Sequence, residues 1–423
     1  MTHMSSPISD TPHLDVIQAV IGTFWHFDLA REMERQGHLK CIYSTFPWTR
    51  IQREGVLRER VRTFPWIHTP QLVLGQRGLI PDALNREITW LMFRTFDAWV
   101  ARNLPRCDVF VAISGAGLRA GQTAQHRGAK YICDRGSSHI RFQDRILREE
   151  FAIWGIEPDS IVDPRMIARE EAEYDLADGI TVPSEFSRRS FIELGVPAHT
   201  IHRIPYGVRL DRFQRTTPPP SDRFEVLFAG GVNLRKGIPW LLQAFAQLRH
   251  PHKRLRLAGA VSPEIRPVLA RLPQDHVEFL GALPQSQLAA AMSSSHVLVL
   301  PSVEDGFGLV MGQGMACGCP CISSRNTGGE DLFTDGVEGF LVPIRSAEAI
   351  AEKLQQLADD PALQQRMSEA ALRRVRQIGG WKEYGDAWAI LLREIRQTEA
   401  PKGAESGMVE VPLQRGSQTS KPS

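Results

Sequence analysis

The apolar positions in the first half of the chain follow two alternating periods. Short runs rich in β-branched residues predict buried strands at residues 16–21, 40–45, 109–113 and 130–133. Apolar residues at helical spacing predict helices at residues 29–36 and 118–126. Because strands and helices that alternate in this way form parallel sheets, the pattern predicts an α/β domain.

The same rhythm restarts after a run that contains Pro218, Pro219 and Pro220, which fits neither a helix nor a central strand. Strands are predicted at residues 225–229, 254–258, 277–280, 297–300 and 320–323. Helices are predicted at residues 238–248, 285–293, 309–317 and 347–358. We therefore expect a second α/β domain, with a ligand-binding cleft between the carboxyl ends of the two sets of strands.

Domain boundaries follow from these patterns. The prediction is a disordered tail at 1–12, a first domain at 13–205, a linker at 206–223, a second domain at 224–380, a helix at 381–397 that returns to the first domain, and a disordered tail at 398–423. The tails are polar and rich in Ser, Pro and Gly, so they cannot bury enough apolar surface to fold.

Composition narrows the class of protein. Of the 423 residues, 42% are hydrophobic and 23% are charged, which is ordinary for a folded protein. A net charge of +2 argues against a nucleic-acid partner. No apolar run is long enough to span a membrane, and the first residues lack the features of a leader, so we expect a cytoplasmic protein. Cys317, Cys319 and Cys321 do not have zinc-ligand spacing, so we expect no bound metal.

A phosphate site is predicted where the strand at 297–300 ends. Asp305, Gly306, Phe307, Gly308 and Leu309 form a glycine-bearing turn that opens a helix. Glycines let a ligand approach the backbone, and the free N–H groups of a helix start attract anions. Asp305 would point into the same cleft and accept hydrogen bonds from sugar hydroxyls. The alternative is that Asp305 only caps the helix and the glycines only turn the chain.

Two cations follow a glycine pair after the first strand of the second half. Gly230 and Gly231 precede Arg235 and Lys236, and a helix is predicted to begin just beyond them. Charge-assisted hydrogen bonds from the two cations, together with the helix start, could hold a diphosphate without a metal. The alternative is a solvated Arg–Lys pair in a loop.

A second glycine pattern predicts a different ligand. Gly115, Gly117 and Ala120 form G-x-G-x-x-A between a strand and a helix, and Asp134 ends the next strand, as in dinucleotide-binding proteins. This pattern lies inside the first domain and not on its opening strand, and a dinucleotide enzyme would leave the anion-binding features of the second half without a role. We therefore prefer the diphosphate site.

A series of short segments carries a further signal through its order along the chain. The segments are residues 29–38, 177–186, 195–197, 204–208, 236–237, 301–302, 306–309, 315–320, 328–330 and 335–343. In this order they resemble the retaining glycosyltransferases of family 4, glycosyl transferases group 1. The resemblance covers most of residues 14–395 and implies two Rossmann-like domains that face each other across a cleft, the arrangement called GT-B.

The resemblance implies roles for the residues of the second half. Lys236 would contact the donor diphosphate, the N–H groups from Gly306 to Leu309 would bind the same phosphates, and Asp305 would address the transferred sugar. The glutamate that usually holds the ribose is replaced by Gln313, a weaker hydrogen-bond acceptor. Gly231 replaces a usual arginine, and we expect Arg235 to supply the missing charge.

The resemblance also implies a histidine and a glycine loop in the first domain. His139 is the nearest candidate for a catalytic histidine that faces the donor sugar, but Arg135 could occupy that place instead. A histidine near a strand end is also a common structural hydrogen-bonding residue. Gly22, after the first strand, is the expected close-approach glycine on the acceptor side.

Between Phe46 and Arg106 the chain has ten arginines, five acidic residues and four of its nine tryptophans. Such a stretch can lie on an anionic membrane surface, so we consider peripheral membrane contact at the inner face. The alternative is a helix at residues 84–104 whose apolar face packs on the domain core.

Together these features predict a metal-independent, cofactor-free, retaining hexosyltransferase. It would move a sugar from a nucleotide-diphosphate donor to a hydroxyl of a glycan or lipid-linked acceptor, in cell-envelope or exported glycan biosynthesis. Two alternatives stay open: a sugar-nucleotide epimerase of the same architecture, and a catalytically silent binding protein.

Overall fold

The computed structural model describes residues 13–76, 79–157 and 161–397. Both tails that were predicted to be disordered lie outside the described residues. The strands of the first half are β1 Val16–Val20, β2 Leu39–Ser44, β3 Val61–Thr63, β4 Val109–Ile113, β5 Lys130–Asp134, β6 Gly179–Val182 and β7 Ile201–Arg203. Those of the second half are β8 Phe224–Ala229, β9 Lys253–Ala258, β10 Val277–Gly281, β11 Val297–Leu300, β12 Cys321–Ser324 and β13 Gly339–Val342.

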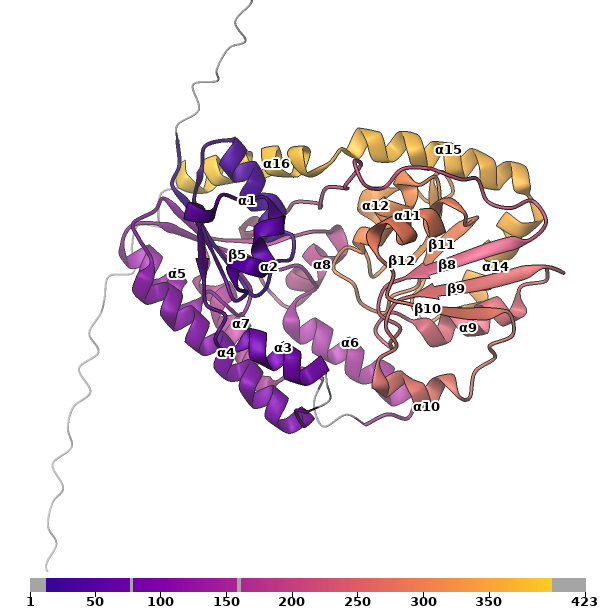
Figure 1. The fold of residues 1–423 in the computed structure, drawn as a ribbon, viewed down its shortest axis with the longest axis horizontal. Helices are drawn as coiled ribbons and strands as arrows, with labels where there is room; N and C mark the ends of the chain where they lie inside the picture. The colour runs from indigo at the N-terminus through magenta and orange to yellow at the C-terminus, as the bar shows by residue number, and fades with distance from the viewer. Residues whose placement is uncertain (1–12, 77–78, 158–160, 398–423) are drawn as a thin grey trace, which may run out of the picture.

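Two lobes are visible in Figure 1, each built on one parallel sheet. The N-terminal sheet has the order β3-β2-β1-β4-β5-β6-β7, and the C-terminal sheet has the order β10-β9-β8-β11-β12-β13. All the residues of β1 and β8 are buried, because helices cover both faces of each sheet. The predicted fold of two Rossmann-like α/β domains in the GT-B arrangement is confirmed.

Helices connect successive strands on both lobes. In the N-terminal lobe they are α1 His26–Arg35, α2 Trp48–Ile51, α3 His68–Gln76, α4 Asp82–Asn103, α5 Leu118–His126, α6 Ile140–Ile153, α7 Pro164–Leu176 and α8 Glu185–Glu193. The others are α9 Ile238–Gln247, α10 Arg266–Leu269, α11 Gln285–Ser293, α12 Leu309–Ala316, α13 Gly329–Leu332, α14 Ala347–Asp359, α15 Pro361–Ile378 and α16 Trp381–Gln397.

The last two helices, yellow in Figure 1, cross from one lobe to the other. Helix α15 packs on α12 of the C-terminal lobe, and α16 packs on α1 of the N-terminal lobe. Gly385 permits this second contact, because a Cβ atom at that position would lie only 2.4 Å from the Cβ of Glu32 on α1. The chain therefore crosses between the lobes twice, once before β8 and once between α15 and α16.

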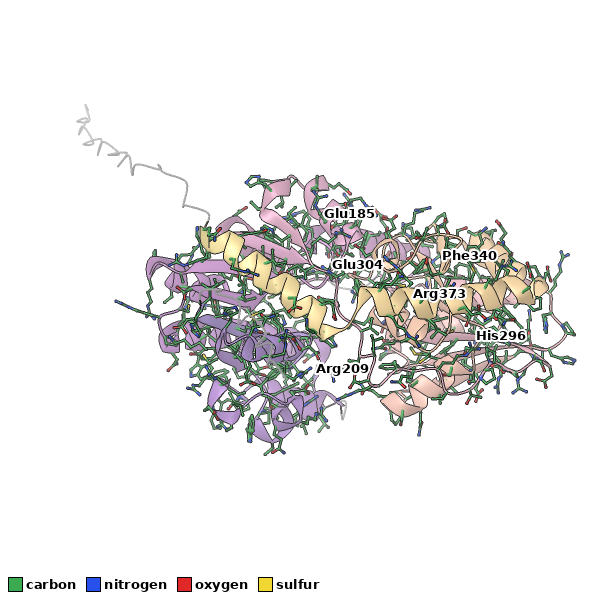
Figure 2. All side chains as sticks on the ribbon, turned by 90° about the horizontal axis from the view of Figure 1, so that it is seen from above. Glu185, Arg209, His296, Glu304, Phe340 and Arg373 are labelled. Atoms are coloured by element: carbon green, nitrogen blue, oxygen red, sulfur yellow. The ribbon has the colours of Figure 1, made fainter. Side chains whose placement is uncertain are left out.

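A buried carboxylate also joins the lobes. Glu304, from the C-terminal lobe, accepts hydrogen bonds from the Ser137 and Ser138 hydroxyls at 2.7 Å and from Gln143 Nε2 at 2.9 Å, all in the N-terminal lobe. Arg235 Nε of its own lobe lies 2.7 Å from the same carboxylate. Figure 2 shows Glu304 between the two lobes.

These donors determine the charge state of Glu304. Burial alone would raise the pKa of the carboxyl, but Arg235 and the serine hydroxyls hold it well below the usual 4.5. A carboxyl whose pKa is lowered by folding stabilises the protein above its unfolded pKa, and that stabilisation is lost as the pH falls through the folded pKa. We therefore expect the contact to persist at neutral pH and to fail only in strong acid.

Replacing this carboxylate should destabilise the protein. Glu304→Ala leaves Arg235, whose side chain is 35% exposed, without its counter-charge, and leaves the Ser137 and Ser138 hydroxyls without their acceptor. We expect a loss of about 2–3 kcal/mol in the free energy of unfolding at pH 7, measured by urea denaturation, because solvent screens part of the charge that is left. The exposed Glu369 on α15 is the matched control, and Glu369→Ala should change stability by no more than about 0.5 kcal/mol. Equal effects of the two substitutions would contradict the role assigned to Glu304.

Candidate functional site

A cleft of about 1120 Å³ lies between the lobes. Its walls include the loops that follow β1, β5, β8 and β11, the segment that connects the lobes, and the first turns of α12 and α16. The strand order reverses at β1–β4 and at β8–β11, so the loops after these strands diverge and leave room for a ligand at the carboxyl ends. The cleft thus lies where the sequence predicted it.

The loop before α12 is shaped by glycine. Gly308 has a φ of +75° and leads directly into the helix at Leu309. Gly237, on the neighbouring loop after β8, has a φ of +67°, and a Cβ atom there would lie 2.0 Å from the Pro301 carbonyl oxygen. These two positions therefore need glycine, and they bring the loop that carries Lys236 against the loop that carries Asp305.

Lys236 and Asp305 meet in the cleft. The Lys236 ammonium forms an ion pair with Asp305 Oδ2, and both residues line the cavity. The other oxygen, Asp305 Oδ1, accepts hydrogen bonds from the backbone N–H groups of Phe307 at 3.4 Å and Gly308 at 3.2 Å. Asp305 therefore caps the turn before α12. Its carboxylate takes the positions that an anion could occupy at Lys236 and at these two amides.

Two further amides at the start of α12 stay open. The N–H groups of Leu309 and Val310 donate to no other atom of the described chain, and both residues line the cleft. Unpaired N–H groups in the first turn of a helix, with the helix dipole behind them, favour an anion. These two amides lie beside the Lys236–Asp305 ion pair on the C-terminal side of the cleft, where they are available to an anion.

Arg235 and Gly306 lie elsewhere. The Arg235 guanidinium is bound by Glu304 and does not line the cleft, although its side chain is 35% exposed. Gly306 faces the other lobe: its carbonyl accepts a hydrogen bond from Ser184 Oγ at 2.6 Å, and a Cβ atom there would lie 2.1 Å from the Gly136 carbonyl oxygen. Both residues therefore lie in the interface between the lobes. Of the predicted cation pair, only Lys236 lines the cleft.

Aromatic side chains form the N-terminal wall of the cleft. Phe24 has a φ of +43°, which is strained for a side chain of this size, and yet its ring is 58% exposed. Next to it, Trp25 donates from Nε1 to Asp134 Oδ2 at 2.6 Å and packs on Tyr206, with ring centroids 4.8 Å apart. Burial raises the pKa of Asp134 to about 6. The buried Tyr206 hydroxyl has no hydrogen-bond partner among the described residues.

The three predicted residues of the N-terminal lobe do not line this cleft. His139 caps α6, its ring packs on Tyr174, and burial lowers its pKa to about 4. Arg135 is buried, forms an ion pair with Glu170 at 2.7 Å and lines a separate cavity.

Gly22 has a φ of +75°, and its N–H donates to Thr45 Oγ1 at 2.8 Å. It shapes the turn that presents Phe24, and Gly136 is the residue after β5 that reaches the cavity.

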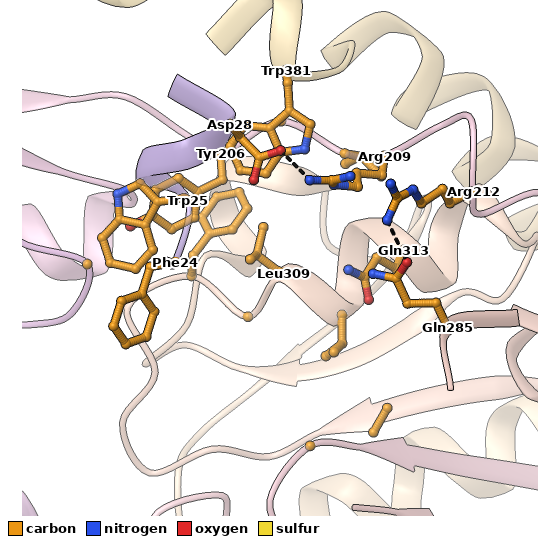
Figure 3. Close-up of a pocket in the computed structure, with 18 of the residues that line it drawn as sticks. Phe24, Trp25, Asp28, Tyr206, Arg209, Arg212, Gln285, Leu309, Gln313 and Trp381 are labelled. Atoms are coloured by element: carbon orange, nitrogen blue, oxygen red, sulfur yellow. Dashed lines mark hydrogen bonds and ion pairs between the residues drawn. The ribbon is translucent and has the colours of Figure 1, made fainter. Parts of the chain in front are cut away.

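The connecting segment adds polar groups that the sequence did not single out. Arg209 forms an ion pair with Asp28 on α1 at 2.6 Å, and Arg212 Nη1 donates to Gln285 Oε1 at 2.9 Å (Figure 3). Gln313 on α12 lines the same cleft, and its side chain hydrogen-bonds to none of the described residues. Asp28 also forms an ion pair with Arg31, so two of the arginines that line the cleft share one carboxylate partner.

The dinucleotide pattern has a structural explanation. The N–H groups of Gly115 and Gly117 donate to the buried Glu173 carboxylate at 2.7 and 3.0 Å. Asp97 accepts from the N–H groups of Arg119 and Ala120 at the start of α5, at 2.9 Å each. The protein's own carboxylates thus fill the place of a pyrophosphate, which argues against a dinucleotide there.

The six cysteines are free thiols, and Cys317, Cys319 and Cys321 are buried. In the described parts of the chain, no three His, Cys, Asp or Glu side chains are grouped so that they could hold a metal ion. Nor does any helix there combine the length and apolar character needed to cross a membrane.

Comparison with known proteins identifies the C-terminal half. Residues 211–374 match the family model described as glycosyl transferases group 1. The C-terminal lobe is a group 1 glycosyl transferase domain. The cleft described above therefore lies between this domain and the α/β domain of the N-terminal lobe.

Curated relatives agree with this assignment. A D-inositol 3-phosphate glycosyltransferase of Streptomyces avermitilis is 34% identical over 206 residues, which are 43% of this chain and 44% of the relative. A GDP-mannose-dependent α-(1-6)-phosphatidylinositol monomannoside mannosyltransferase of Mycolicibacterium smegmatis is 28% identical over 52% of this chain and 64% of the relative. The chain thus spans about half the length of the curated relatives it matches.

Solved structures share the fold of both lobes. Sucrose-phosphate synthase of Thermosynechococcus elongatus has a TM-score of 0.67 at 20% identity, over 90% of this chain and 99% of that one. Anabaena HepE in complex with UDP has a TM-score of 0.65 at 16% identity, over 90% and 100%. At these identities the likeness shows the fold alone.

Proposed function

We propose that this protein is a retaining, metal-independent glycosyltransferase that uses a nucleotide-diphosphate sugar. The observation that carries the proposal is that Lys236 and the open amides of Leu309 and Val310 line the same cleft between the lobes. An ammonium group and helix N–H groups are the donors that a diphosphate requires. The HepE structures with UDP and UDP-glucose show that a protein of this fold binds such ligands.

On the donor side, Lys236 would exchange one anion for another. In the structure it pairs with Asp305, and in the complex the diphosphate would take the ammonium and the open amides. Asp305, released from Lys236, would then accept hydrogen bonds from hydroxyls of the sugar. As the bond from the anomeric carbon to the phosphate oxygen breaks, negative charge grows on the diphosphate, and these preorganised donors stabilise it.

On the acceptor side, Phe24 and Trp25 would hold the group that receives the sugar. Aromatic rings pack well on the apolar faces of sugars, and the hydrogen bond from Trp25 to Asp134 fixes one of the two rings. The acceptor hydroxyl oxygen would form the new bond to the anomeric carbon, and its proton would pass to the departing phosphate. Attack and departure on one face of the sugar retain its configuration.

Two further parts of the proposal concern conditions and biological role. Because Lys236 and the helix start supply positive charge to the diphosphate, we propose that no metal is required. The named reaction of the mycobacterial relative, on a phosphatidylinositol mannoside, supports a role in cell-envelope or exported glycan biosynthesis. The acceptor in this proposal is a glycan or a lipid-linked glycan.

Substitutions of the two members of the Lys236–Asp305 pair should have opposite effects on diphosphate binding, although both should slow transfer. Lys236→Ala should slow transfer by about 30- to 1,000-fold, from about 2–4 kcal/mol of lost transition-state stabilisation, and should also weaken nucleoside diphosphate binding. Asp305→Asn should also slow transfer but should keep or strengthen diphosphate binding, because it removes the anion that competes for Lys236. Donor turnover and calorimetry with UDP, GDP and ADP measure the two effects.

The control for this experiment is Lys353→Ala, on α14 outside the cleft, which should leave both quantities unchanged. A rate reduction of less than threefold in Lys236→Ala would show that this residue does not hold the diphosphate. If the wild-type protein neither binds a nucleoside diphosphate nor consumes its sugar, the proposed function is wrong.

Gln313 is proposed to hold the ribose, where its amide oxygen accepts a hydrogen bond. Gln313→Glu should retain or improve nucleotide affinity, because a carboxylate is the stronger acceptor. Gln313→Leu should weaken affinity by about fivefold, the effect of one neutral hydrogen bond of about 1 kcal/mol. Calorimetry in which Gln313→Glu abolishes binding would rule out the ribose role.

A further inference from the structure

A separate slot of about 400 Å³ opens on the N-terminal lobe, and it shares no residue with the cleft. Its floor is apolar: Phe64 and Trp99 lie with ring centroids 5.1 Å apart, beside Leu91 and Ala98. Most of its lining comes from one face of α4, with Phe64 from the loop after β3 and Arg119 from the start of α5. The slot is therefore a surface feature of the region where β3, α4 and α5 meet.

Three arginines surround this apolar floor. Arg94, Arg102 and Arg119 line the slot, all three are exposed, and none of them forms an ion pair with a described residue. Arg94 lies over the ring of Trp90, at 5.6 Å from its centroid. The nearest carboxylate on the same helix, Asp97, is buried and paired with Arg169, so it does not neutralise the three cations. The slot thus carries uncompensated positive charge.

Apolar side chains are exposed on the neighbouring elements. Helices α3 and α4 pack side by side, and Figure 1 shows them at the bottom of the N-terminal lobe. Trp66 is 75% exposed and Leu91 is 51% exposed. The other exposed large apolar residues from β3 to α4 are Val73, Leu74, Leu79 and Leu84. The helix expected at 84–104 does pack Met92, Phe96 and Val100 into the core, but it also leaves apolar residues uncovered.

We propose that this slot and the exposed side chains of α3 and α4 form a docking site for an anionic phospholipid in a bilayer. Exposed apolar residues interspersed with unpaired arginines are typical of proteins that lie at the membrane interface. The phosphate of the lipid would bind Arg94, Arg102 and Arg119, and the apolar part of the lipid would lie on Phe64 and Trp99. Because the slot is outside the cleft, this site does not depend on the proposed transfer reaction.

Sedimentation with lipid vesicles tests the proposal on the full chain. The wild type should bind vesicles of phosphatidylcholine with 30% phosphatidylglycerol, and should bind pure phosphatidylcholine vesicles much more weakly. Replacing Arg94, Arg102 and Arg119 together with Gln should reduce the partition coefficient about 100-fold, at roughly fivefold for each arginine near an anionic surface. These arginines form no ion pair with a described residue, so the variant should nearly keep the wild-type melting temperature.

A charge-matched control uses three arginines of α15 on the other lobe. Replacing Arg366, Arg373 and Arg376 with Gln changes the net charge equally and should leave vesicle binding unchanged. Binding of the wild type should also fall steeply as potassium chloride is raised, which tests the electrostatic part without a substitution. The proposal is overturned if the wild type does not prefer anionic vesicles, or if both triple variants bind alike.

Discussion

Glu304 places a negative charge in the interface between two lobes, where an unpaired carboxylate would be strongly unfavourable. The charge is tolerated because Ser137, Ser138 and Gln143 from one lobe and Arg235 from the other donate to it. These contacts hold the loop after β11 against the N-terminal lobe, where the Gly306 backbone touches Gly136. Because Asp305 follows Glu304 directly, the contact that joins the lobes also sets the position of the carboxylate in the cleft.

On the C-terminal side of the cleft, the charged side chains are already paired with each other. Lys236 and Asp305 neutralise each other, and Asp305 also caps the amides of Phe307 and Gly308. Only the N–H groups of Leu309 and Val310 remain open at the start of α12. A diphosphate that enters therefore competes with an internal anion, and this competition links donor binding to release of the residue proposed to contact the sugar.

Much of the fold was predictable because each strand is an apolar run bounded by turn residues. The strands β3, β6, β7 and β13 were not assigned from the pattern. β3 and β7 have only three residues each, which carry little periodic signal. Within the site, the glycine turn at Gly308 and the placement of Lys236 and Asp305 could be inferred from the sequence.

The direction of side chains at the lobe interface could not be inferred. Arg235 and Lys236 are neighbours, but only Lys236 reaches the cleft, because Arg235 is bound by Glu304 at the lobe interface. The sequence did not mark Phe24 as a residue of the site, because its exposure depends on a positive φ angle that no motif indicates. His139 looked like a candidate catalytic residue, and only the packing of Tyr174 and Phe191 around its ring showed that it lies outside the cavity.

The central claim is that a diphosphate binds between Lys236 and the first turn of α12. A crystal structure with the nucleoside diphosphate that binds most tightly is the most direct test. The account predicts the terminal phosphate within hydrogen-bond distance of the Leu309 and Val310 amides, with the Lys236 ammonium moved from Asp305 to the phosphate. A phosphate bound elsewhere, with Lys236 still paired to Asp305, would contradict it.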